Sequence, residues 1–242
     1  MAQAVVSAQD AQRLNTAFAT VHPVDIIRWA VETFRPDVAM TSSFGAESAC
    51  LIHMAIQVDP TISIRMVDTS FLFDETLQFM EELKKRYKLN ISVFRTKMDV
   101  EQFKKDHADL PPEHPDYCCG DYKVEATERA LAGLRSWITG IRRSQATTRA
   151  QTPFVEALSS GLVKVAPLAA WTPKDIHQYM TKNDLPYHPL WHKGYTSIGC
   201  WPCTQKPLDP NDPRSGRWAG QDKKECGIHF IGKPDQPDKP QE

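Results

Sequence analysis

Hydrophobic positions recur at two spacings along the chain, and from position 38 onward segments of the two kinds alternate. Short apolar stretches of the kind that forms buried strands occupy 38–43, 63–68, 91–95, 137–141 and 162–165. Stretches with helical spacing surround them, at 7–34, 47–57, 74–87, 100–105, 121–131 and 172–183. The pattern therefore predicts strands and helices in alternation.

This alternation is typical of an α/β fold, in which helices flank a twisted parallel sheet. Ligands of such sheets bind beyond the carboxyl ends of the strands. The loops after Ser43, Asp68 and Ile141 are therefore the first candidates for a site. We expect residues 1–203 to form a single α/β domain. The remainder, 204–242, is rich in proline, glycine and charge, and is predicted to be an irregular, mobile C-terminal tail.

Composition fits one ordinary globular domain: 242 residues, of which 41% are hydrophobic and 24% charged. The formal net charge is −1. Because there is no global basic field, we expect neither nucleic acid nor a membrane as partner, and an anionic substrate would need a local cluster of cations. We see no signal peptide, and no apolar stretch reaches the roughly 18 residues of a membrane helix. We therefore expect a cytoplasmic protein, where cysteines are more often ligands or nucleophiles than disulfides.

Four of the six cysteines form two close pairs, Cys118 with Cys119 and Cys200 with Cys203. Core thiols are the ordinary alternative, but the neighbouring glycines and proline indicate loops. Four cysteines can also hold zinc. Two adjacent thiolates on one tetrahedral ion would strain the backbone, whereas the separate irons of a [4Fe–4S] cluster can each take one. The spacing favours the cluster and leaves zinc as the alternative.

Cys226 stands apart from these pairs. Two lysines precede it, at positions 223 and 224, and His229 follows it, so cations surround it in the sequence. Positive neighbours raise the thiolate character of a cysteine and with it the nucleophilicity. A stray exposed thiol near the chain end is the alternative. Cys50 lies among apolar residues of a predicted helix and is expected in the core.

Candidate anion-binding groups fall into two sets. Ser42, Ser43 and Gly45 lie at a strand-to-helix turn, where backbone N–H groups and hydroxyls can cradle an anion, although simple helix capping is an equal alternative. Glu47 follows as a first-turn acid. The candidate cations are Lys123, Arg142, Arg143, Arg149, Arg214 and Arg217. A solvated surface is the alternative for each of them, and the one we favour for Arg142.

Several longer motifs follow one another in a fixed order over 37–229. They are Ser42-Ser43-Phe44-Gly45-Ala46-Glu47, Val67-Asp68-Thr69, Cys118-Cys119 with Lys123, Thr139-Gly140-Ile141-Arg142-Arg143-Ser144-Gln145, Tyr195-Thr196-Ser197-Ile198-Gly199-Cys200-Trp201-Pro202-Cys203-Thr204, Arg214-Ser215-Gly216-Arg217-Trp218 and Glu225-Cys226-Gly227-Ile228-His229. Together they are specific. The chain resembles the thioredoxin-dependent assimilatory adenylyl-sulfate reductases, within the larger family of adenylyl-sulfate and phosphoadenylyl-sulfate reductases.

The resemblance implies an adenine-nucleotide α-hydrolase-like (Rossmann-like) fold and a reaction. Cys226 would attack the sulfur of adenylyl sulfate to form an S-sulfocysteine, and thioredoxin would then release sulfite. In this family the four paired cysteines typically hold a [4Fe–4S] cluster and mark the users of adenylyl sulfate. Members without them use the 3′-phosphorylated substrate, and some cluster-bearing members take both. The resemblance leaves oligomeric state open, a homo-oligomer included.

The resemblance also assigns substrate-binding roles. The phosphosulfate would be held by Lys123, Arg149, Arg214, Arg217 and His229, and the nucleotide would approach the backbone at Gly140. Two departures from the usual family pattern are Ser70, in place of glycine, and Lys224, in place of threonine. Neither removes a group that the chemistry requires.

Two other classes of protein compete with this interpretation. An ATP-dependent adenylyl-transferring enzyme of the same broad fold would carry a Ser-Gly-Gly-x-Asp-Ser loop, whereas 43–48 reads Ser-Phe-Gly-Ala-Glu-Ser. A non-catalytic metal-binding regulator of nucleic acid would carry a basic stripe, which the near-neutral chain lacks.

Overall fold

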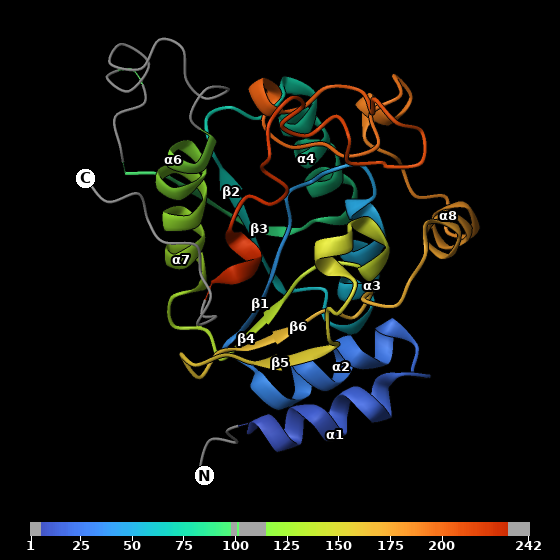
Figure 1. The fold of residues 1–242 in the computed structure, drawn as a ribbon. Helices are drawn as coiled ribbons and strands as arrows, with labels where there is room; N and C mark the ends of the chain where they lie inside the picture. Colours follow the sequence, from blue (N-terminus) through green and yellow to red (C-terminus); the bar gives the residue numbers. More distant parts are fainter. Residues whose placement is uncertain (1–5, 98–100, 102–114, 232–242) are drawn as a thin grey trace.

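The computed structural model describes residues 6–97, 101 and 115–231 and shows helices on both faces of one sheet (Figure 1). The sheet has six strands in the order β3-β2-β1-β4-β6-β5. Neighbours are parallel except β5 and β6. The strands are β1 (Val38–Thr41), β2 (Ser63–Asp68), β3 (Asn90–Arg95), β4 (Ser136–Ile138), β5 (Val155–Ala157) and β6 (Val163–Val165). The predicted α/β class and parallel sheet are confirmed.

The helices largely follow the predicted pattern. They are α1 (Ala8–Phe18), α2 (Pro23–Phe34), α3 (Ser48–Val58), α4 (Asp74–Tyr87), α6 (Pro115–Cys119), α7 (Glu125–Leu131) and α8 (Pro173–Lys182), with a π-helical turn, Gly120–Val124, between α6 and α7. The helical stretch predicted over 7–34 is divided into two helices, because His22 caps a second helix that begins at Pro23. The helix expected at 100–105 lies outside the described residues, apart from Glu101.

The two faces of the sheet carry separate cores. Ile138 of β4 packs into the larger core, together with residues of α2, α3, α4 and α8. The preceding residue, Trp137, points to the opposite face because side chains alternate along a strand. There it packs with Val124, Leu131, Leu158, Leu162 and Ile231. Helix α7 and the end of the described tail therefore cover this second face.

Connections diverge around β1, which pairs with β2 on one side and β4 on the other. Such a switch point leaves a crevice beyond the carboxyl ends of the strands. Strands β1 and β4 end at Thr41 and Ile138, earlier than predicted. Ser42, Ser43 and Gly140 consequently lie in loops that face this crevice.

The tail, from position 204 onward, is packed against the domain as far as it is described. Its last segment, red in Figure 1, runs beside α7. Trp218, Cys226 and Ile231 are all buried. The described part of the tail contains no long helix or strand, and these buried residues pack it against the domain. No helix of the described chain combines the length and apolar character needed to cross a bilayer.

Candidate active site

A cavity of about 240 Å³ lies at the switch point, between the sheet and the tail. The loops after β1, β2 and β4 line it together with residues of the tail. It contains every substrate-binding residue suggested by the sequence, together with the candidate nucleophile: Ser42, Ser43, Gly45, Lys123, Gly140, Arg149, Arg214, Arg217, Cys226 and His229. Residues far apart in the chain are thus gathered around one space.

The turn after β1 does not serve as a helix cap. The Ser42 hydroxyl accepts a hydrogen bond from the amide of Phe44 at 3.1 Å, while Phe44 adopts a left-handed φ of 48° and is fully buried. Glu47 occupies the N-cap position of α3 and makes no side-chain hydrogen bond to the first turn. The capping alternative for these serines is therefore not realised, and the turn lines the cavity instead.

Arg142 is buried, so the expectation of a solvated surface position is wrong. Its Nη2 lies 2.5 Å from Oε2 of Glu47, and its backbone amide donates to Gln145 Oε1 at 3.1 Å. Glu47 thus holds the loop after β4 against the start of α3. The partner could not be found from local sequence because it lies far away in the chain.

A second buried ion pair joins the domain to the tail. Arg149 donates from Nε and Nη2 to the two carboxylate oxygens of Glu225, both at 2.6 Å. Arg214 approaches the same carboxylate at 3.5 Å. Burial favours the neutral acid, but the hydrogen bond and charge of Arg149, followed by the charge of Arg214, outweigh it and lower the pKa of Glu225. Sequence reasoning noted Glu225 only as part of a motif.

His229 lines the cavity as a neutral ring. Burial, followed by the charges of Arg149 and Lys164, holds its pKa well below the usual value. The ring stacks on Trp137 at 6.3 Å, and its Nδ1 is buried with no hydrogen-bond partner among the described residues. With its pKa lowered in this way, His229 offers a neutral hydrogen-bonding group to the cavity.

The thiol of Cys226 is buried beside cations. Burial raises its pKa, but the charge of Lys123, a hydrogen bond from the Ile228 amide and the charge of Arg217 together lower it below the usual value. In turn, burial opposes the charge on Lys123, while the sulfur atoms of Cys226 and Cys200 favour it and raise its pKa. The thiolate form of Cys226 is thereby favoured, as a nucleophile requires.

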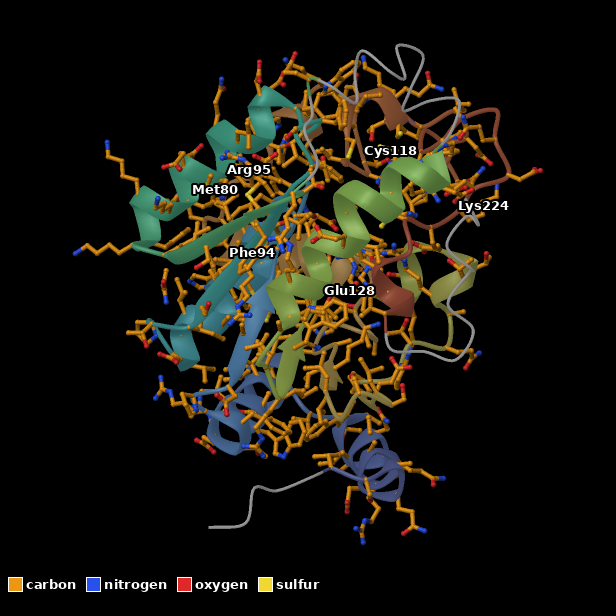
Figure 2. All side chains as sticks on the ribbon, turned by 90° about the vertical axis from the view of Figure 1, so that its left-hand side faces the viewer. Met80, Phe94, Arg95, Cys118, Glu128 and Lys224 are labelled. Carbon is orange, nitrogen blue, oxygen red and sulfur yellow. The ribbon has the colours of Figure 1, made fainter. Side chains whose placement is uncertain are left out.

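The four paired cysteines line a second cavity that adjoins the first. Cys118 and Cys119 end α6, just before the π-helical turn, while Cys200 bridges to Leu72 and Cys203 ends a short turn. All four surround one space with Thr69, Lys123, Arg217, Trp218 and Cys226. Figure 2 shows Cys118 near the end of the long green helix, close to the tail at Lys224. Lys223 of the tail pairs with Asp116 of this helix.

These cysteines are free thiols in the structure. Burial raises the pKa of Cys119 to about 12 and raises that of Cys203 as well. Thr69 Oγ1 lies 3.2 Å from Cys200 Sγ. Among the described residues, no three Cys, His, Asp or Glu side chains are gathered closely enough for a single metal ion.

Trp218 is a further site residue that the sequence analysis did not single out. Its buried ring has three cations near its centre: Arg217 at 4.5 Å, Lys223 at 5.7 Å and Arg214 at 6.0 Å. An aromatic face attracts cations, so the ring can hold these like charges together. It lines both cavities. A tryptophan directly after two motif arginines was the available signal.

The fold and site define a nucleotide-binding α/β protein with a thiol at the carboxyl edge of its sheet. Residues 37–206 match the family model described as phosphoadenosine phosphosulfate reductase domain. The chain belongs to this family, as the sequence motifs indicated. The fold is accordingly adenine-nucleotide α-hydrolase-like.

Similar proteins agree with this assignment. The chain is 40% identical over 227 residues to an adenosine 5′-phosphosulfate reductase of Mesorhizobium japonicum. The aligned region covers 93% of this chain and 89% of that protein. A protein of the same name from Staphylococcus epidermidis is 39% identical over 215 residues, or 87% of this chain and 88% of that one.

Solved structures give the same result. A phosphoadenylyl-sulfate reductase from Candida auris, in a phosphate complex, superposes with a TM-score of 0.73 at 30% identity, over 84% of this chain and all (100%) of that one. A Candida glabrata FMN adenylyltransferase is alike in fold alone, with a TM-score of 0.55 at 14% identity, over 89% of this chain and 82% of that one.

Proposed function

We propose that this protein reduces adenylyl sulfate to sulfite and AMP in the assimilation of sulfate. One observation carries the proposal: the buried Cys226 thiol lies where the switch-point cavity meets a cluster of cations. The names of the relatives, adenosine 5′-phosphosulfate reductase, support the substrate.

The chemistry follows from a thiolate facing a phosphosulfate anhydride. The sulfur of Cys226 attacks the sulfur of the sulfonyl group, and the S–O bond to the phosphate breaks. AMP leaves with the bonding electron pair, and an S-sulfocysteine remains on Cys226. No electron is transferred in this step, because one nucleophile replaces another at the same sulfur.

Cations around the thiol match the charges of the substrate. Lys123 and Arg217 lie beside Cys226 and suit the sulfonate and the leaving phosphate. Fixed positive charge in a water-poor cavity stabilises the charge that develops on the leaving oxygen. Neutral His229 can hydrogen-bond to the same oxygens. Ser42, Ser43, Gly45 and Gly140 line the part of the cavity beyond the strands, where an adenosine would lie.

Thioredoxin is the proposed reductant. One of its thiolates would attack Cys226 Sγ and displace sulfite, leaving a mixed disulfide. Its second thiol would then displace Cys226 and form the disulfide of oxidised thioredoxin. Two electrons thus come from the dithiol, and the thiolate of Cys226 is regenerated.

The paired cysteines fit a [4Fe–4S] cluster, with Cys118, Cys119, Cys200 and Cys203 as its ligands. All four line one cavity, and adjacent Cys118 and Cys119 can bind different irons of a cluster. A cluster has separate corners for such a set. When bound it would supply charge and rigidity next to Lys123; the proposed reaction involves no one-electron step.

A sulfite-release assay with adenylyl sulfate and thioredoxin tests the reaction. We expect Cys226→Ser to abolish release but to keep cluster and AMP binding, while the buried Cys50→Ala control stays active. Without thioredoxin, mass spectrometry should find one sulfonate on the peptide that contains Cys226. The assigned mechanism is wrong if no adduct forms there, or if Cys226→Ser still turns over.

Substrate choice and cofactor are tested separately. The second candidate substrate is the 3′-phosphorylated form, used alone or together with adenylyl sulfate. The name of the Candida auris relative, phosphoadenylyl-sulfate reductase, supports this candidate. We expect kcat/KM to be higher for adenylyl sulfate than for its 3′-phosphorylated form. The opposite preference would overturn the substrate assignment but not the proposed reaction at Cys226.

Anaerobically purified protein should be brown, with about four irons and four sulfides. Stoichiometric zinc without labile sulfide would refute the cluster.

A further inference from the structure

The carboxylate of Glu225, one residue before the proposed nucleophile, is held by the domain on several sides. Both of its oxygens accept from Arg149 at 2.6 Å, and Oε1 also accepts from Thr148 Oγ1 at 2.9 Å. The side chains of Glu225 and Arg149 are only 7% and 9% exposed. A paired, bidentate and buried contact of this kind is strong and geometrically specific.

Arg149 is itself fixed by the domain. Its Nη1 donates to Gln145 Oε1 at 2.7 Å, and the same oxygen accepts the amide of Arg142. All three side-chain nitrogens of Arg149 therefore donate to protein acceptors, which uses three of its five N–H groups. A guanidinium fixed in this way cannot turn as a whole towards a substrate, although the resemblance assigns Arg149 a substrate-binding role.

The carboxylate of Glu225 bonds to Arg149 and is not part of the lining of the substrate space. The described residues that line the switch-point cavity include Arg149, Arg214 and Cys226 but not Glu225. Glu225 therefore does not fill the place of an anion. It ties the domain to the tail at the residue that precedes the thiol.

The attachment continues on the other side of Cys226. Gly227 turns the chain with a φ of 88°, and Lys164 donates to the backbone oxygen of His229 at 3.0 Å. Ile228 then packs on the core cluster that contains Trp137. With the apolar contact on one side and Glu225 on the other, the thiol is held between two fixed points.

We propose that Glu225 is a positioning residue, and that its pair with Arg149 is a clasp that sets Cys226 against the substrate. Arg149 then anchors the tail, and the phosphosulfate is bound by Lys123, Arg217 and neighbouring groups. This inference rests on the proposed function for its kinetic part only. Its structural part concerns the position of the thiol and requires no substrate.

The first measurement is the rate at which iodoacetamide alkylates Cys226 in the cluster-loaded protein, followed by mass spectrometry of its peptide. Breaking a buried ion pair costs enough free energy to weaken the attachment of the tail. The fraction of molecules in which iodoacetamide can reach the Cys226 thiol should therefore rise by about tenfold or more. We expect this increase in Glu225→Gln. The matched control, Glu75→Gln, removes an exposed pair with Lys193 and should react like the wild type.

The second measurement separates positioning from substrate binding. In both Glu225→Gln and Arg149→Gln we expect kcat for sulfite release to fall by about tenfold or more, with KM changed by less than about threefold. Because both substitutions break the same ion pair, Cys226 of the double variant should be alkylated no faster than Cys226 of either single variant. The double variant removes both charges of the Arg149 pair and leaves Arg214 with its hydrogen bonds to Ser197 and Lys224, so near-UV circular dichroism of this variant is used to check that it folds.

Wild-type alkylation rates in Glu225→Gln and the double variant would overturn the proposal. So would a raised KM with unchanged kcat in Arg149→Gln, since that pattern marks a substrate ligand. If the wild type releases no sulfite from either nucleotide, the proposed function fails, while the alkylation rates still decide whether the clasp exists.

Discussion

His188 shows how a single side chain can make stability depend on pH. It is fully buried, and its Nδ1 accepts the amide of Leu190 at 3.1 Å. The proton of the neutral ring therefore lies on Nε2, which donates to Thr76 Oγ1 at 3.0 Å. Burial lowers the pKa of His188 to about 4, although the charge of Glu75 opposes this.

We predict that His188 makes the protein less stable in mild acid. Between its unfolded pKa of about 6.5 and its folded value, the unfolded chain binds a proton that the folded chain does not, so stability falls as pH falls through this window. The loss amounts to about 2 kcal/mol by pH ~5. Urea unfolding should show the advantage of wild type over His188→Asn shrinking from pH ~7.5 to ~5. An unchanged difference would contradict this, and His192→Asn, at an exposed residue, is the control.

Residue roles could be predicted where the chemistry is local. Cys50 is fully buried, as its apolar neighbours indicated. Ser70, which stands where similar proteins usually have glycine, adopts a left-handed φ of 61°, and this explains the usual glycine. Burial of Arg142 and the neutral state of His229 could not be predicted, because their causes are charges and partners distant in sequence.

At the scale of elements, periodicity found five of the six strands and missed β5, whose three residues place charged Glu156 between Val155 and Ala157. Strands β4 and β6 are as short, but apolar neighbours extend the pattern there to 137–141 and 162–165. Contacts distant in sequence define strand β5. The side chain of Asn15 in α1 donates to the C=O of Val155 and accepts from its N–H, and this closes the edge of the sheet. The π-helical turn Gly120–Val124 contains Lys123, which lines the cavity, and π-helical turns often lie at functional sites.

Gly216 allows two parts of the tail to meet. A Cβ there would clash with the backbone oxygen of Gln205 and lie 2.6 Å from that of Lys206. Backbone atoms cannot swing aside as a side-chain end can. We predict that Gly216→Ala displaces the segment that carries Arg214 and Arg217, and raises KM for adenylyl sulfate by about tenfold, as overpacking of 1–3 kcal/mol would.

The control for this substitution is Gly120→Ala. It also lies close to the cysteine cavity, but nothing lies within 4 Å of its Cβ position. We expect its KM to stay near the wild-type value, and both variants to keep the far-UV circular dichroism of the folded domain. Equal KM values for the two variants would show that the close approach at Gly216 does not matter for the site.

At the scale of the whole molecule, the tail completes a site that the domain only half builds. The domain supplies the turn after β1, Lys123 and Arg149, and the tail supplies Arg214, Arg217 and the thiol. The sequence predicted both halves because each carries its own motif. It could not predict how they dock, since Glu225 meets Arg149 only after the sheet has formed. That the tail moves remains a prediction.

Burial of the nucleophile makes this movement testable. Cys226 is 7% exposed, so a protein as large as thioredoxin cannot reach its sulfur in the observed arrangement. Reduction by thioredoxin, as proposed, would require the tail to open after AMP leaves, as lids over active sites do. We predict that backbone amides of 214–231 exchange hydrogen faster in nucleotide-free, S-sulfonated enzyme than in enzyme saturated with AMP. Amides of β1 and β4, in the middle of the sheet, provide the internal control and should exchange slowly in both states. If the tail amides remain as protected as those of the central strands in both states while thioredoxin still releases sulfite, reduction must proceed without opening, and the two-state description of the tail is wrong.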